Sequence, residues 1–239
     1  MAALHFFANP ARFRRFSQRV LPALWVVTAL ALTIGLYWGL VIAPPDYQQG
    51  DTVRIMFLHV PTASLSMAGY LLLAALGASL LVWRHPLAGL MARAAAPVGA
   101  TYAAVCLITG SLWGRPMWGT YWVWDARLTS FLLLFFLYLG HIALSRAYDD
   151  SERGDRAAAI LAVVGAINVP IIKFSVDWWN TLHQPESIMR LGGPAIDPSL
   201  LWPLLWMMGA MALLFVALVL LRTETEIDRR RLEIAENQD

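Results

Sequence analysis

The chain has 239 residues, of which 59% are hydrophobic and only 14% are charged, and its formal net charge is +2. This composition excludes an ordinary soluble domain, and the sequence carries no basic patch of the kind that binds nucleic acids. We therefore expect an all-α polytopic membrane protein.

Six apolar segments are long enough to cross a hydrocarbon core of roughly 30 Å as helices. In chain order they are residues 21–43, 55–83, 94–113, 128–146, 157–174 and 200–221. Pro61, near the start of the second segment, marks either a first helical turn or a bend. The sequence thus predicts one six-span transmembrane domain over residues 1–239, with no separate soluble domain.

The distribution of basic residues predicts the orientation of these spans. Loops rich in Arg and Lys stay on the cytoplasmic side, and six spans put both termini on one side. That side carries thirteen of the eighteen basic residues. We expect cytoplasmic termini, a first span retained as an anchor, and a charged tail over 222–239 that acts as a topology signal and solvated surface.

The third span holds the only cysteine, Cys106, so the chain cannot form an internal disulfide or a CxxC redox pair. We interpret Cys106 as a core residue. No glycine-rich phosphate loop, HExxH motif or Ser-His-Asp arrangement is present. The chain is therefore not expected to be an enzyme, and any ATP hydrolysis would belong to a partner subunit.

Residues 118–129, WGTYWVWDARLT, contain three of the eleven tryptophans and are expected to face outward. Isolated tryptophans would indicate an interfacial aromatic belt, but this density, with a charge pair, favours a docking surface for a flat aromatic ligand. Gly119 would let a planar ring approach the backbone. If the segment is an interfacial helix, it has two faces. One consists of Trp118, Trp122, Asp125 and Thr129, and the other of Tyr121, Trp124 and Leu128.

Two of the five histidines share an unusual position. His59 and His183 each precede a proline by two residues, and both are expected at the outward ends of spans or in outer loops. Paired neutral imidazoles can fill both axial positions of a porphyrin iron. Their expected convergence with the tryptophan segment predicts a metalloporphyrin site. Three further tryptophan positions, Trp113, the pair Trp178 and Trp179, and Trp202, would enlarge the aromatic surface.

Arginines near this surface are candidates for the ligand's carboxylates. Arg127, helped by Arg54, Arg115 or Arg190, would suit haem propionates because a guanidinium pairs well with a carboxylate. Asp125 would orient Arg127 or contact a partner.

Residues 118–129 resemble the tryptophan-rich WWD signature, WGxxWxWDxRLT, of haem-handling proteins of cytochrome c biogenesis, and every specified position is filled. The six spans, the length and the two histidines resemble in particular the CcmC family. The resemblance implies a protein that holds haem b transiently at the periplasmic face of the bacterial inner membrane. It also implies delivery to the haem chaperone CcmE, beside the ATPase CcmA, the membrane subunit CcmB and the small protein CcmD.

The resemblance further implies roles for single residues. His59 and His183 would be the axial ligands of the iron. Contacts to haem or to the chaperone would come from Trp113, Trp118, Trp122, Trp124, Asp125 and Arg127.

Two other functions stay open. A quinone-reactive haem b subunit would pair histidines within the bilayer, where His141 has no well-placed second histidine. A permease subunit of an ABC transporter for haem or a small molecule would show polar residues along a mid-membrane path. The spans offer little beyond Asn168, which with Pro170 indicates a local bend.

Overall fold

A computed structural model describes residues 9–183, 193 and 195–236, and these residues form helices joined by short connections. The elements are α1 (Pro10–Tyr37), the π-helix η2 (Trp38–Ile42), the 3-10 helix η3 (Asp51–Ile55), α2 (Met56–Trp83), α3 (Pro86–Trp118), α4 (Ala126–Leu144), α5 (Ser151–Gly165), α6 (Asn168–Trp178) and α7 (Pro198–Glu236). Within the described residues, six helical segments are long and apolar enough to cross a membrane. The expectation of an all-α, multi-pass membrane protein is confirmed.

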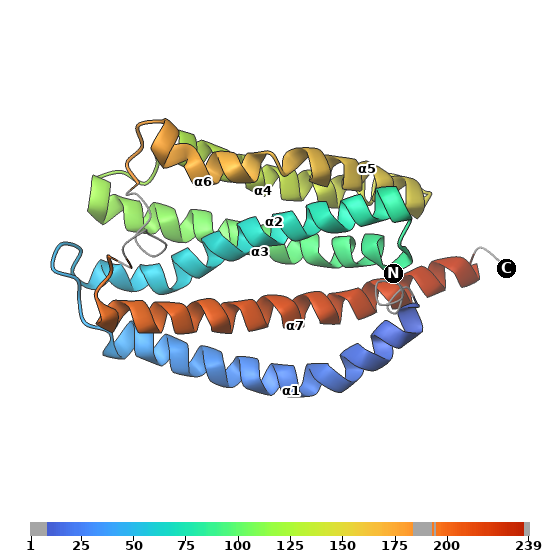
Figure 1. The fold of residues 1–239 in the computed structure, drawn as a ribbon, viewed down its shortest axis with the longest axis horizontal. Coiled ribbons are helices and arrows are strands. Elements are labelled where there is room, and N and C mark those ends of the chain that lie inside the picture. The colour runs from blue at the N-terminus through green and yellow to red at the C-terminus, as the bar shows by residue number, and fades with distance from the viewer. Residues whose placement is uncertain (1–8, 184–192, 194, 237–239) are drawn as a thin grey trace.

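Each helical span runs antiparallel to the one before it, with α5 and α6 together forming one span, so the bundle has two distinct ends (Figure 1). We call one the terminal end, because α1 begins there and α7 ends there. We call the other the loop end, which contains the connections 43–50, 119–125 and 179–183. In the packing between helices, α2 lies chiefly against α3, and α1 against α7.

Three buried tyrosines tie the helices together. Each hydroxyl donates a hydrogen bond to a backbone carbonyl of another helix: Tyr138 to Ser66 at 2.6 Å, Tyr102 to Met211 at 2.8 Å and Tyr70 to Leu161 at 3.3 Å. In an apolar interior, such bonds satisfy hydroxyls that would otherwise be costly to bury.

Several helices extend beyond the predicted spans, and one span is interrupted: the third span, expected at 94–113, is α3 at Pro86–Trp118. Helix α1 begins at Pro10 rather than at residue 21, because Asn9 accepts a hydrogen bond from the Ala11 amide and caps it. The fifth span is divided into α5 and α6 by a turn at 166–167, just before Pro170. Asn168 donates to the Ser130 carbonyl at 2.9 Å beside this turn, which agrees with the expected bend.

The charged tail departs further from expectation, because α7 continues through it for a total of 39 residues. Thr223 and Ile227, one helical turn apart, are buried, and Ile227 packs in a cluster with Phe13, Leu87 and Leu90. The interpretation of 222–239 as solvated surface is therefore wrong for this face of the helix. Buried residues recur about every 3.6 residues between the charged ones and form one face of the helix. This face packs against α1 and α3.

A network of buried charges closes the terminal end. The Asp155 carboxylate of α5 accepts a hydrogen bond from Arg93 of α3 and lies 3.4 Å from the Arg230 guanidinium of α7. Arg93 also donates to the Ser151 carbonyl at 2.9 Å. One carboxylate thus links three helices.

Candidate functional site

The tryptophan segment does not form one helix: residues 119–125 connect the end of α3 to the start of α4 and are not helical. Helix α3 ends at Trp118, and Gly119 takes a left-handed conformation with φ of 77° while its amide donates to the Arg115 carbonyl. Asp125 then caps α4 by accepting a hydrogen bond from the Leu128 amide at 2.7 Å. The expected interfacial helix and its two faces are wrong, because a glycine stop and an aspartate start lie within the motif.

A Cβ atom at Gly119 would meet no atom of the described chain within 4 Å, so no packing contact inside the protein requires glycine there. The approach of a ligand ring to this open position stays a prediction. The positive φ of Gly119 is what favours glycine there, because this conformation lets the chain leave α3 without a Cβ penalty.

His59 lies in the first turns of α2, with its ring directed at α3. Its Nδ1 lies 3.1 Å from the Cys106 carbonyl and 3.1 Å from the Thr109 hydroxyl. Gly110 makes this approach possible, because a Cβ there would lie 2.9 Å from Cε1 of the imidazole. Cys106 is buried in the core as expected, and it also forms part of the wall behind His59.

Trp113 packs its ring edge to face with His59, at a centroid distance of 5.6 Å. Its indole N–H donates to the side-chain carbonyl of Gln49 at 3.0 Å. Gln49 belongs to a turn whose Gln48 and Gln49 amides both donate to Asp46. Sequence reasoning missed Gln49, Thr109 and Gly110, since nothing in their local pattern shows which histidine or tryptophan they would meet.

His183 is held by two residues of the tryptophan segment. Its ring packs against Trp118 at a centroid distance of 4.9 Å, and its Nδ1 lies 3.6 Å from Oδ2 of Asp125. Burial lowers the pKa of His183 and the charge of Arg127 lowers it further, while Asp125 acts in the opposite direction. The imidazole therefore stays neutral to a lower pH than an exposed histidine, as ligation of a metal requires.

The arginines proposed for propionates are engaged within the chain. Arg127 donates to the Ser175 hydroxyl at 3.2 Å and to the Lys173 carbonyl at 3.4 Å, which docks the start of α4 on α6. Arg54 bonds to the Leu40 carbonyl and pairs with Asp51. Arg115 bonds to the Gly119 carbonyl and lies over the Tyr121 ring. Arg190 lies outside the described residues.

The other tryptophans predicted for this surface lie in three separate places. Trp122 and Trp124 pack edge to face at 5.5 Å, and Trp124 is 76% exposed. The indole N–H of Trp122 is buried without a hydrogen-bond partner among the described residues. Trp178 and Trp179 pack against each other at the end of α6.

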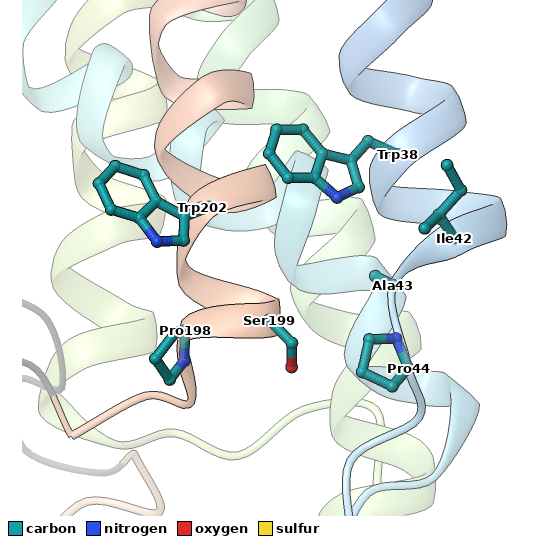
Figure 2. A pocket seen from close by; sticks show the side chains of 7 residues that line it. All are labelled: Trp38, Ile42, Ala43, Pro44, Pro198, Ser199 and Trp202. Atoms are coloured by element: carbon teal, nitrogen blue, oxygen red, sulfur yellow. The ribbon is translucent and has the colours of Figure 1, made fainter.

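Trp202 faces a separate pocket of about 300 Å³ with Trp38, Pro44 and Pro198, between η2 and the start of α7 (Figure 2). No contact between Trp202 and the tryptophan segment is found within the described residues. The structure thus brings Trp113 and Trp118 each into contact with a histidine, whereas it does not join Trp202 to the same aromatic surface among the described residues.

The chemistry of this arrangement follows from the orientation of the two imidazoles. Both rings turn Nδ1 toward protein acceptors, and neither Nε2 makes a hydrogen bond to any residue that the structure describes. The Nδ1–H tautomer leaves a lone pair on Nε2, the usual state of a metal-bound histidine. Two imidazoles with Nε2 available are the donor chemistry that a porphyrin iron accepts at its axial positions.

Comparison with known proteins extends the similarity to the whole chain. A family model described as Heme exporter protein C matches residues 3–238. Heme exporter protein C of Bradyrhizobium diazoefficiens is 62% identical over 226 residues, which cover 94% of this chain and 85% of the relative. Its counterpart in Escherichia coli K12 is 45% identical over 236 residues, covering 98% and 95%. A putative cytochrome c biosynthesis ccmC-like mitochondrial protein of Marchantia polymorpha is 44% identical over 190 residues, covering 80% and 78%.

Proposed function

The chain belongs to the Heme exporter protein C family, and on this premise we propose that it holds haem b between His59 and His183 and presents it to the haem chaperone CcmE. Membership itself makes the chain a membrane subunit of haem export and cytochrome c maturation, with a role in transport or delivery. Bound haem would supply the iron for both histidines and a vinyl edge for capture by the chaperone.

One observation carries the proposal: two imidazoles from distant parts of the chain lie at the loop end, each edged by a tryptophan and each with Nε2 left for a ligand. His59 comes from a membrane-crossing helix, whereas His183 comes from the connection after α6. A helix and a loop can move apart more easily than two helices, which suits a site that must release its cargo.

The positive-inside rule supports placing this site at the periplasmic face of the inner membrane. Thirteen of the eighteen basic residues fall on the side of the termini, which assigns the terminal end to the cytoplasm. The loop end then faces the periplasm, where a soluble domain of the chaperone can reach it.

The partners we propose are CcmE, the ATPase CcmA, CcmB and CcmD. The chain itself has no glycine-rich phosphate loop, so any ATP hydrolysis that drives the exporter must occur in another subunit. The quinone-reactive alternative requires histidines paired within the bilayer, and the sequence offers no second well-placed histidine in the spans beside His141 of α4.

A co-purification experiment tests this function. The tagged chain, expressed with and without CcmE, should carry haem with a low-spin spectrum of two histidine ligands and should retain CcmE in a haem-dependent manner. If the purified protein binds no haem when haem is supplied, or retains CcmE equally without haem, the proposal fails. Reduction of the bound haem by a quinol would support the quinone-reactive alternative.

Replacing Gly110 with alanine should weaken haem binding while the protein still accumulates in the membrane. The new Cβ would lie 2.9 Å from the His59 ring and would push the imidazole away from its two acceptors. Haem content per protein measures the effect. Gly209→Ala is the matched control, because a Cβ at that position of α7 meets nothing within 4 Å. Equal haem content in both variants would contradict the proposed role of the His59 ring in its position beside Gly110.

A further inference from the structure

Asp125 uses its two carboxylate oxygens for two different purposes. Oδ1 accepts the Leu128 amide at 2.7 Å and caps α4, whereas Oδ2 faces the connection after α6, 3.4 Å from the Leu182 amide and 3.6 Å from Nδ1 of His183. The Asp125 side chain is only 9% exposed. One buried carboxylate therefore joins the start of a membrane-crossing helix to the segment that carries an imidazole.

Nδ1 of the His183 ring is buried and lacks a hydrogen-bond partner within the described residues. Oδ2 of Asp125 is the nearest acceptor shown, a little beyond hydrogen-bond distance. Hydrogen bonds at functional sites are often long in the free protein and shorten on binding. The Trp118 ring, packed on the imidazole, limits the directions in which His183 can turn.

We propose that Asp125 is a positioning residue for His183: it accepts the Nδ1–H and thereby fixes the tautomer that offers Nε2 to a porphyrin iron. This inference rests on the proposed function and changes the expected role of Asp125, which was contact with haem or with the chaperone. A carboxylate acceptor also makes an imidazole a stronger electron donor to a bound metal. The aspartate of the WWD signature then serves the histidine and not the macrocycle.

The two imidazoles are unequal in this respect. His59 has neutral acceptors on Nδ1, the Cys106 carbonyl and the Thr109 hydroxyl, whereas His183 faces a carboxylate. A change at Asp125 should therefore affect one axial bond and leave the other intact.

Substitutions at Asp125 can separate its two purposes. Asparagine and serine both cap helices about as well as aspartate, so Asp125→Asn and Asp125→Ser should keep α4. In Asp125→Asn, the amide oxygen caps the helix and its NH₂ group faces His183. That donor favours the opposite tautomer, with the proton on Nε2, as the same replacement does in the catalytic triad of serine proteases. In Asp125→Ser the side chain is too short to reach the ring.

We expect Asp125→Asn to bind haem roughly 10- to 100-fold more weakly than the unchanged protein, with Asp125→Ser less affected. The remaining haem should show a raised reduction potential and loss of the low-spin spectrum. Added imidazole should restore that spectrum, because it fills the position left by His183. The melting temperature of the haem-free protein should not change. Asp150→Asn, at the cap of α5, is the matched control because no histidine of the described chain pairs with Asp150.

The outcomes distinguish this inference from the proposed function. If His59→Ala and His183→Ala abolish the two-histidine spectrum while Asp125→Asn keeps the affinity and potential of the unchanged protein, positioning by Asp125 is overturned. It is also overturned if imidazole fails to restore the spectrum, or if Asp125→Asn loses only its binding to CcmE. If the histidine variants leave the spectrum unchanged, the proposed function itself fails.

Discussion

Replacing either His59 or His183 with alanine is expected to abolish the low-spin, two-histidine spectrum of haem in the purified protein. Each variant removes one of two axial ligands, so the iron would become five-coordinate or would be lost from the protein. The absorption spectrum of oxidised and reduced protein, together with haem content, measures the effect. Added imidazole should restore the low-spin spectrum less readily in the His59 variant than in the His183 variant, because the His59 ring lies between α2 and α3.

His85→Ala provides the matched control for this experiment. His85 precedes α3 at the terminal end, and its loss should leave both haem content and spectrum unchanged. A spectrum that survives both His59→Ala and His183→Ala would contradict ligation by these residues. Loss of the spectrum in all three variants would show a general effect of histidine replacement on the protein.

The positions of the helices could largely be predicted from the sequence, because hydrophobic length is a local property. The second span, expected at 55–83, is α2 at Met56–Trp83, and the fourth, expected at 128–146, is α4 at Ala126–Leu144. The buried stripe in residues 222–236 was missed because a high charge density hid its helical period. Gly119 and Asp125 are typical of a helix stop and a helix start, whereas the tryptophan spacing between them favours a continuous helix.

The site could be predicted only in part. The residue types and the topology indicated His59, His183 and the tryptophan segment, and the structure brings Trp118 and Asp125 to His183. The supporting residues Gln49, Thr109 and Gly110 were not predictable, because each acts through a contact with a distant part of the chain. A pattern along one helix does not show which residue of the next helix it will meet.

The largest effect on stability is expected for Asp155→Ala at the terminal end. Its carboxylate is paired with Arg93, and the two side chains are only 6% and 8% exposed. The substitution would leave the Arg93 guanidinium buried without its counter-charge, and Arg230 would lose the same partner. Removing one member of a buried pair typically costs about 3–5 kcal/mol in the free energy of unfolding. Denaturant titration in detergent micelles would measure this loss.

An exposed ion pair in the same region shows whether burial of the charges is the cause of the expected loss of stability. Arg153 and Asp150 lie 3.4 Å apart, but their side chains are 78% and 54% exposed, so Arg153→Ala should cost at most about 1 kcal/mol. Asp155→Asn should fall between the two, because the amide can still accept a hydrogen bond from Arg93. Equal losses for Asp155→Ala and Arg153→Ala would mean that water reaches the Asp155 carboxylate. The three helices α3, α5 and α7 would then be held at this end by their apolar contacts alone.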